Sequence, residues 1–132
     1  MLQYLHSSAK NQQIKPLERP RAGSWVRCER PNEDELAELL SLGLDNDLLS
    51  DALDPHEVPR LEIDDDWTYL IARLPDTDDD FNDFTTPILF CLNKDYAVTL
   101  SRDSLGRLWQ PFIDQARSRT DRPVELLVEM ID

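Results

Sequence analysis

The sequence predicts an α/β protein of the α+β type, with a mostly antiparallel sheet and helices packed on its faces. Three observations support this prediction. Residues 61–100 contain short stretches of alternating apolar and polar side chains, separated by turns rich in aspartate and asparagine. Segments with helical spacing flank this region at 31–54 and 111–132. The 132 residues and 40% hydrophobic content suit one domain with one core.

The first 30 residues predict two strands joined by an irregular connection. Leu2–Leu5 alternates weakly between apolar and polar side chains. Asn11–Gly23 is polar and contains two prolines, which favours irregular structure. Ser24–Glu29 alternates more clearly, with a tryptophan and two charged residues on one face and Val26 and Cys28 on the other.

Two short helices are predicted between residues 31 and 54. Asn32 can cap the first helix, Glu35 stands three residues later, and Gly43 provides a stop. The second helix is predicted over Asp45–Asp54, because the residue before a proline avoids helical backbone angles. Its apolar stripe, expected to pack on the sheet, consists of Leu48, Leu49, Ala52 and Leu53.

A continuous β-meander is predicted over Leu61–Leu100. Its strands are expected at 61–64, 67–74, 86–92 and 96–100. The stretch Trp67–Leu74 is apolar on both faces, which predicts an interior strand covered on two sides. Pro75–Asp83 is expected to be an acidic loop between the second and third strands.

The last part of the chain predicts two helices. A helical region is expected to open at Ser104–Gly106, with its main helix over Pro111–Ser118, because proline favours the first turn of a helix. The second begins at Pro123 and has no stop signal, which predicts that the chain is a fragment of a longer protein. We expect a single domain over 1–132, with residues 1–23 as a lead-in strand and connection and 123–132 as the start of the departing helix.

The charge of the chain limits its partners. Its 27 acidic and 14 basic side chains give a formal net charge of −13. Nucleic acid and anionic membrane surfaces both require a basic surface, so neither is expected as a partner. An acidic surface instead favours cations or basic protein partners. The longest apolar run, Ile88–Leu92, is far shorter than the roughly 20 residues that span a bilayer, so a soluble chain is expected.

Enzymatic catalysis is not expected. The sequence has no G-x-S-x-G elbow, P-loop or dinucleotide-binding fingerprint, and only three glycines. Its histidines are His6 and His56, and His56 is expected to be a turn residue with local hydrogen bonds. Cys28 and Cys91 lack the spacing of a zinc site, so we expect reduced thiols in the core of a cytosolic protein.

One face of the predicted second helix is acidic. Asp47, Asp51 and Asp54 stand at i, i+4 and i+7, and like charges at this spacing repel one another. A divalent cation such as Mg²⁺ would remove that repulsion, since it needs only one or two carboxylates and keeps most of its waters. A solvated acidic face without a metal is the open alternative.

The acidic loop does not form an EF-hand. Asp76, Asp78 and Asp80 match the first ligand positions of such a loop, but Phe81 replaces the required glycine and Pro87 stands where the closing glutamate belongs. A weak cation site and a solvated loop remain open.

Three segments follow one another in order: LGLDNDLLSDALDPHEVPRLE, D-x-x-Y-L-I-A-R-L-P and T-x-P-I-L-F-x-L-N-x-x-Y-A-V-T-L. Together they resemble the N-terminal cytosolic domain of CorA-type magnesium transporters, from about Trp25 to the C-terminus. The resemblance implies a pentamer, with a stalk helix and two transmembrane helices beyond residue 132 and Gly-Met-Asn after the first of these. It also implies that only those missing segments enter the membrane, with this domain at the cytoplasmic face of the inner or plasma membrane.

The resemblance also implies a site. In this family, an aspartate on the short helix before an H-x-x-P-[RK] segment helps to bind a regulatory divalent ion at a subunit interface. Asp51 matches it, with its partner on a neighbouring subunit's stalk helix, while Asp47 and Asp54 are helpers on geometry alone. Ser50 departs from the acidic residue often found beside that aspartate. We therefore expect a sensor domain of a Mg²⁺ or Co²⁺ transporter that binds Mg²⁺ weakly in isolation and has no other cofactor. The alternative is a stand-alone acidic protein-interaction module without a metal role.

Overall fold

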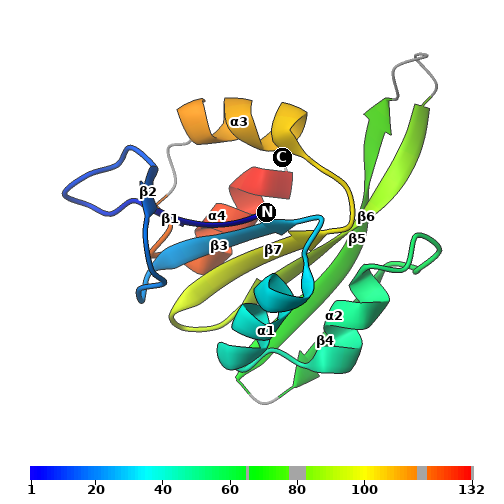
Figure 1. Cartoon of the computed structure of the whole chain (residues 1–132). Coiled ribbons are helices and arrows are strands. Elements are labelled where there is room, and N and C mark those ends of the chain that lie inside the picture. Colours follow the sequence, from blue (N-terminus) through cyan, green and yellow to red (C-terminus); the bar gives the residue numbers. More distant parts are fainter. Residues whose placement is uncertain (65, 78–82, 116–118, 132) are drawn as a thin grey trace.

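A seven-stranded sheet with helices on both faces forms the protein. The computed structural model describes residues 1–64, 66–77, 83–115 and 119–131. Within them the sheet order is β2-β1-β3-β7-β6-β5-β4. The elements are β1 (Leu2–His6), β2 (Lys15–Leu17), β3 (Ser24–Glu29), α1 (Glu33–Ser41), α2 (Asn46–Ala52), β4 (Arg60–Asp64), β5 (Trp67–Thr77), β6 (Asp83–Leu92), β7 (Tyr96–Ser101), α3 (Gly106–Gln115) and α4 (Pro123–Ile131). The predicted α+β class is confirmed (Figure 1).

The sheet combines the predicted meander with an N-terminal half that the meander does not include. Strands β4 to β7 pair antiparallel in chain order, as predicted. Strand β3 then pairs with β7 in parallel, with Trp25 opposite Ala97, and β1 pairs antiparallel with β3. The prediction that Trp67–Leu74 is interior is confirmed, since β5 lies between β4 and β6.

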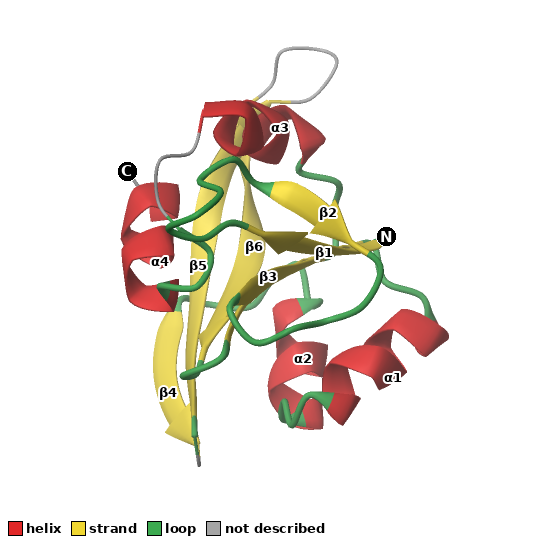
Figure 2. Cartoon of the chain, turned by 90° about the vertical axis from the view of Figure 1, so that its left-hand side faces the viewer, coloured by secondary structure: helices red, strands yellow, loops and turns green. Residues whose placement is uncertain are grey.

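Each face of the sheet carries its own hydrophobic core, because side chains alternate between the two faces of a strand. On one face, α1 and α2 cover a cluster that contains Tyr69 and Ile71 of β5. On the other, α3 and α4 cover a cluster against which Leu70 and Ala72 of the same strand pack. Figure 2 shows α4 on one side of the sheet and α1 and α2 on the other.

Both cysteines lie in the core beneath α1 and α2. Cys28 and Cys91 are free and buried, as expected. Burial raises the pKa of the Cys28 thiol to about 12 and that of the Cys91 thiol well above its ordinary value. Both thiols are therefore protonated near neutral pH and serve as small apolar side chains.

The core beneath α3 and α4 is built on aromatic contacts. Trp25 of β3 meets Trp109 and Phe112 of α3 edge-to-face, with ring centroids 5.3 and 5.7 Å apart. The Trp25 indole Nε1–H donates to the Thr99 hydroxyl at 3.0 Å, so its polar atom is satisfied inside the core.

The signals for the first two helices are confirmed. The Glu35 N–H donates to the Asn32 side chain at 2.8 Å, and the Asn32 N–H donates to the Glu35 carboxylate at 3.1 Å, completing a capping box. Gly43 has a φ of +99°, the left-handed conformation that ends the helix and favours glycine. Helix α2 ends earlier than predicted, at Ala52, with Leu53 as its C-cap.

Two other predictions, for strand β2 and for the start of helix α3, were wrong. Strand β2 lies in the segment that was expected to be irregular. Its Pro16 is tolerated because β2 is an edge strand, where a missing N–H does not break the sheet. Helix α3 starts at Gly106, where a helical region was expected to open, but it continues through Pro111 instead of starting there, since Trp109 packs against Trp25 and keeps the earlier turn helical. Its predicted end at Ser118 lies outside the described residues.

The expected acidic loop is shorter than predicted. Strand β5 continues to Thr77 and β6 begins at Asp83, so both ends of the predicted loop belong to an extended hairpin. Of the EF-hand positions considered, Asp78 and Asp80 lie outside the described residues, and Asp76 is in β5.

Candidate functional site

Helix α2 turns an acidic face away from the core. Its N-cap is Asp45, whose carboxylate accepts a hydrogen bond from the Leu48 N–H at 3.0 Å. The Asp45 N–H in turn donates to the Tyr69 hydroxyl of β5 at 2.9 Å, which ties the start of the helix to the sheet. Since Leu48 and Leu49 are buried, the opposite face of the helix points to solvent.

Asp51 is on that outer face and forms an ion pair. Its side chain is 42% exposed, and its carboxylate accepts a hydrogen bond from the Arg60 guanidinium at the start of β4. Arg60 also lies 3.8 Å from the Glu57 carboxylate and 3.5 Å from that of Glu62. We call Asp51, Glu57, Arg60 and Glu62 the Arg60 cluster. Three carboxylates share one guanidinium, so the cluster carries excess negative charge.

The environment of Arg60 reflects that excess. Its hydrogen bond to Asp51 raises the pKa of the guanidinium, and the charges of Glu62 and Glu57 raise it further. Its Nε atom is shielded from solvent yet has no hydrogen-bond acceptor, because Glu62 approaches no closer than 3.5 Å. The guanidinium is therefore held chiefly by Asp51.

The other two predicted metal ligands are placed differently from Asp51. Asp47 is exposed in the first turn of α2, one helical turn before Asp51. Asp54 lies beyond the end of the helix, and its carboxylate accepts a hydrogen bond from the His56 N–H at 2.9 Å. The predicted helical relation therefore holds for Asp47 and Asp51 but not for Asp54. His56 lies in this turn and makes a local hydrogen bond through its backbone N–H, as expected.

Arg73 supports this region and was not singled out from the sequence. Its guanidinium donates to the carbonyl oxygens of Pro55 and Glu57 at 3.1 and 3.0 Å. It also donates to the hydroxyl and the carbonyl oxygen of Thr85 in β6, both at 2.8 Å. Arg73 thus anchors the segment between α2 and β4 to the sheet. An arginine within the largely apolar run Tyr69–Leu74 was the available signal.

The carboxylate oxygens on the outer face of α2 are of the type that Mg²⁺ prefers, but the ion pair between Asp51 and Arg60 makes them less available to a cation. Carboxylate oxygens are the ligands that this hard cation prefers, and one or two suffice when waters complete its shell. Asp47 and Asp51 present such oxygens on one exposed face. Among the described residues, no group of three or more His, Cys, Asp or Glu side chains is arranged to hold a metal. Arg60 already binds one of the two Asp51 carboxylate oxygens, so a cation at Asp51 would compete with Arg60 for the negative charge.

Comparison with known proteins identifies the family. The family model described as CorA-like Mg²⁺ transporter protein matches residues 21–132. The cobalt/magnesium transport protein CorA of Methanocaldococcus jannaschii is 30% identical over 88 residues, which cover 64% of this chain and 27% of that protein. The chain therefore spans well under half the length of this curated relative.

Solved structures share the fold. The soluble domain of CorA from M. jannaschii superposes with a TM-score of 0.74 at 22% identity, covering 99% of this chain and 54% of that one. The complete structure of the same transporter superposes with a TM-score of 0.73 at 23% sequence identity, and the match covers 99% of this chain and 43% of that one. The ZntB cytoplasmic domain from Vibrio parahaemolyticus superposes with a TM-score of 0.70 at 16% sequence identity, and the match covers 99% of this chain and 56% of that one.

These matches agree with the observed fold and with the three sequence segments that resemble CorA-type transporters. In the part of the chain that the structure describes, no helix has the length and apolarity needed to cross a membrane. The matched region includes α2, the Arg60 cluster and the whole meander. The chain belongs to the CorA-like Mg²⁺ transporter family, a family of transporters rather than enzymes, and has the fold of the CorA soluble domain.

Proposed function

We propose that the chain is the cytoplasmic regulatory domain of a transporter for Mg²⁺ or Co²⁺, and that it senses divalent cations through carboxylates at subunit interfaces. Family membership over residues 21–132 supports the transporter role. The observation that carries the sensing role is the exposed carboxylate of Asp51, which is held by a side-chain cation within a cluster of excess negative charge.

The mechanism is an exchange of counter-ions at Asp51. At low divalent-ion concentration, the Asp51 carboxylate keeps its hydrogen bond to Arg60, and acidic faces of neighbouring domains repel each other. A bound Mg²⁺ supplies a double positive charge that carboxylates of two subunits can share. Asp51 then turns from Arg60 towards the interface, and Asp47 adds a second oxygen donor on the same helix face. The repulsion between the domains falls, which favours the closed arrangement of the transporter.

The proposed partners are further copies of the same protein. The family resemblance implies a pentamer, in which the partner of Asp51 lies on a neighbouring stalk helix. The outer face of α4 supports contacts with further protein, because Val124, Val128 and Ile131 are each more than half exposed. The membrane is reached only through segments outside residues 1–132, at the cytoplasmic face.

A Mg²⁺ titration of the 132-residue chain, followed by NMR shifts of backbone amides at 47–54, tests the role of Asp51. We expect weak, saturable shifts in the wild type and their loss in Asp51→Asn. Asp114→Asn is the matched control, since Asp114 is exposed on α3 and its loss changes the charge equally. Identical responses of wild type and Asp51→Asn would contradict a site at this residue.

A protein-interaction role without metal is the second candidate. The edge strand β4 favours it, because Leu61 and Ile63 are 64% and 76% exposed beside an unpaired strand edge. The same titration separates the candidates, since this role predicts no site-specific Mg²⁺ response at 47–54.

A further inference from the structure

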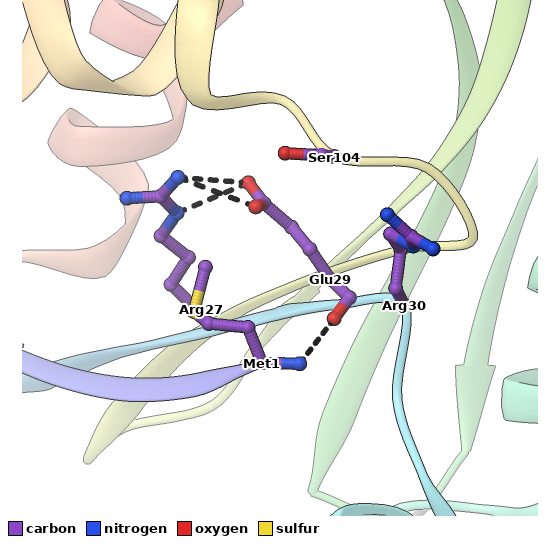
Figure 3. A pocket seen from close by; sticks show the side chains of 5 residues that line it. All are labelled: Met1, Arg27, Glu29, Arg30 and Ser104. Carbon is purple, nitrogen blue, oxygen red and sulfur yellow. Dashed lines mark hydrogen bonds and ion pairs between the residues drawn. The ribbon is translucent and has the colours of Figure 1, made fainter.

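A pocket of about 480 Å³ lies on the α3 and α4 face of the sheet, where β1 and β3 meet the segment after β7. Its lining residues, which define the arginine pocket, are Met1, Arg27, Glu29, Arg30 and Ser104 (Figure 3). The lining contains two guanidinium groups and one carboxylate, so its side chains contribute a net charge of +1. The chain as a whole carries −13, so the pocket is a local reversal of charge.

The inner wall of the pocket is a buried ion pair. Arg27 and Glu29 are 6% and 3% exposed and share one face of β3, where strand alternation places them in line with Trp25. The Arg27 Nε and a terminal nitrogen donate to the two Glu29 oxygens at 3.1 and 3.3 Å. The other terminal nitrogen donates to the Gln3 side chain at 3.3 Å. These bonds hold the Arg27 guanidinium to Glu29 and Gln3 through all three of its nitrogens.

The outer wall is a second arginine held in an uncommon backbone conformation. Arg30 has a φ of +48°, in the left-handed region that non-glycine residues rarely occupy. Its N–H donates to the Ser101 carbonyl oxygen at 3.0 Å, which fixes this turn. Its exposed guanidinium makes no ion pair within the described part of the chain. Figure 3 shows Arg30 across the pocket from Arg27, with Ser104 above the Glu29 carboxylate.

The other charges at or beside the pocket have hydrogen-bond partners. The α-amino group of Met1 donates to the Glu29 carbonyl oxygen at 2.5 Å and to the Glu35 carboxylate at 3.0 Å. Asp103, next to Ser104, accepts a hydrogen bond from the Thr86 hydroxyl at 2.9 Å and does not line the pocket. Among the residues that line the pocket, Arg30 is the charged side chain without an ion pair to any described residue.

We propose that the arginine pocket binds a small oxyanion, a ligand with a carboxylate or phosphate group, at the Arg30 guanidinium on the outer wall, where Ser104 also lines the pocket. Guanidinium groups recognise such oxygens through paired, charge-assisted hydrogen bonds. Arg27 neutralises the Glu29 carboxylate, which lies between the two arginines (Figure 3), and the Ser104 hydroxyl adds a neutral donor. Because this pocket is on the opposite face of the sheet from α2, it is separate from the proposed cation site.

Anion titrations of the 132-residue chain test this proposal. Inorganic phosphate and acetate are each added against chloride at equal ionic strength, and NMR follows the arginine Nε–H signals and the amides of residues 27–30 and 101–104. We expect saturable shifts with at least one anion, and the stronger of the two identifies the ligand chemistry. Absence of saturable shifts with both anions overturns the proposal.

Charge-matched variants separate a site from general attraction. Arg30→Gln should weaken binding by about tenfold or more, and Arg30→Lys should restore part of it, since a lysine keeps the charge but not the paired donors. Lys94→Gln is the control, because it removes the same charge in the turn between β6 and β7, at the other end of β7 from Ser101. Equal affinity of Arg30→Gln and Lys94→Gln overturns the proposal. Unfolding curves of both variants establish that the fold is retained.

Discussion

Two arginine–carboxylate groups in this domain have similar chemistry and opposite environments. Arg27 and Glu29 are buried within the sheet, whereas Asp51 and Arg60 face solvent between α2 and β4. A buried charge has lost its hydration and depends on its partner, so the first pair is a fixed part of the fold. An exposed pair can exchange its partner for water or ions at little cost, so the second can respond to the surroundings. Burial, rather than residue type, decides which pair is structural.

The largest expected effect comes from breaking the buried pair. Arg27→Ala leaves the Glu29 carboxylate in the core without its main partner, which should lower the free energy of unfolding by about 3–5 kcal/mol. Urea unfolding followed by circular dichroism measures this loss.

Two controls sharpen that measurement. Arg19→Ala removes an exposed arginine and should change the stability by less than about 0.5 kcal/mol. The double variant Arg27→Met with Glu29→Leu should recover most of the lost stability, because apolar side chains of similar size need no counter-charge. If Arg27→Ala costs no more than Arg19→Ala, the pair is not the structural element that its burial indicates.

An intermediate effect is expected where the fold supports the exposed pair. Arg73→Gln removes the hydrogen bonds to Pro55, Glu57 and Thr85, and should cost about 1–3 kcal/mol. Hydrogen exchange of amides at 56–60 should become faster, because the segment that carries Glu57 and Arg60 loses its anchor. Arg122→Gln is the control, since the pair of Arg122 with Glu125 is exposed. Unchanged exchange in Arg73→Gln would show that the segment is held by other contacts.

The smallest effect on stability is expected at the exposed pair itself. Arg60→Gln should change the unfolding free energy far less than Arg27→Ala does. The change caused by Arg60→Gln should become smaller still as NaCl is added, because salt screens exposed charges. The same variant should bind Mg²⁺ several-fold more tightly, since Asp51 no longer has a competing cation. Isothermal titration calorimetry measures this, with Lys94→Gln as a charge-matched control. Equal Mg²⁺ affinity of Arg60→Gln and Lys94→Gln would mean that Arg60 does not compete.

The sequence by itself determined the elements whose signals are local. The capping box of Asn32 and Glu35, the stop at Gly43 and the bounds of β3 all depend on residues a few positions apart. The order of the meander follows in the same way, because short turns force consecutive strands to pair antiparallel. The family segments add the expectation that Asp51 has a functional role, which stays a prediction.

Tertiary structure decided what depends on distant contacts. The parallel pairing of β3 with β7 and the helical turn before Pro111 both rest on packing between residues far apart in the chain, around Trp25. The ion-pair partners of the arginines could not be predicted from the sequence either. With 27 acidic side chains, spacing alone does not select which carboxylate pairs with Arg60 or Arg27. Local sequence sets backbone conformation through short-range sterics and hydrogen bonds, whereas strand register and burial set which side chains meet.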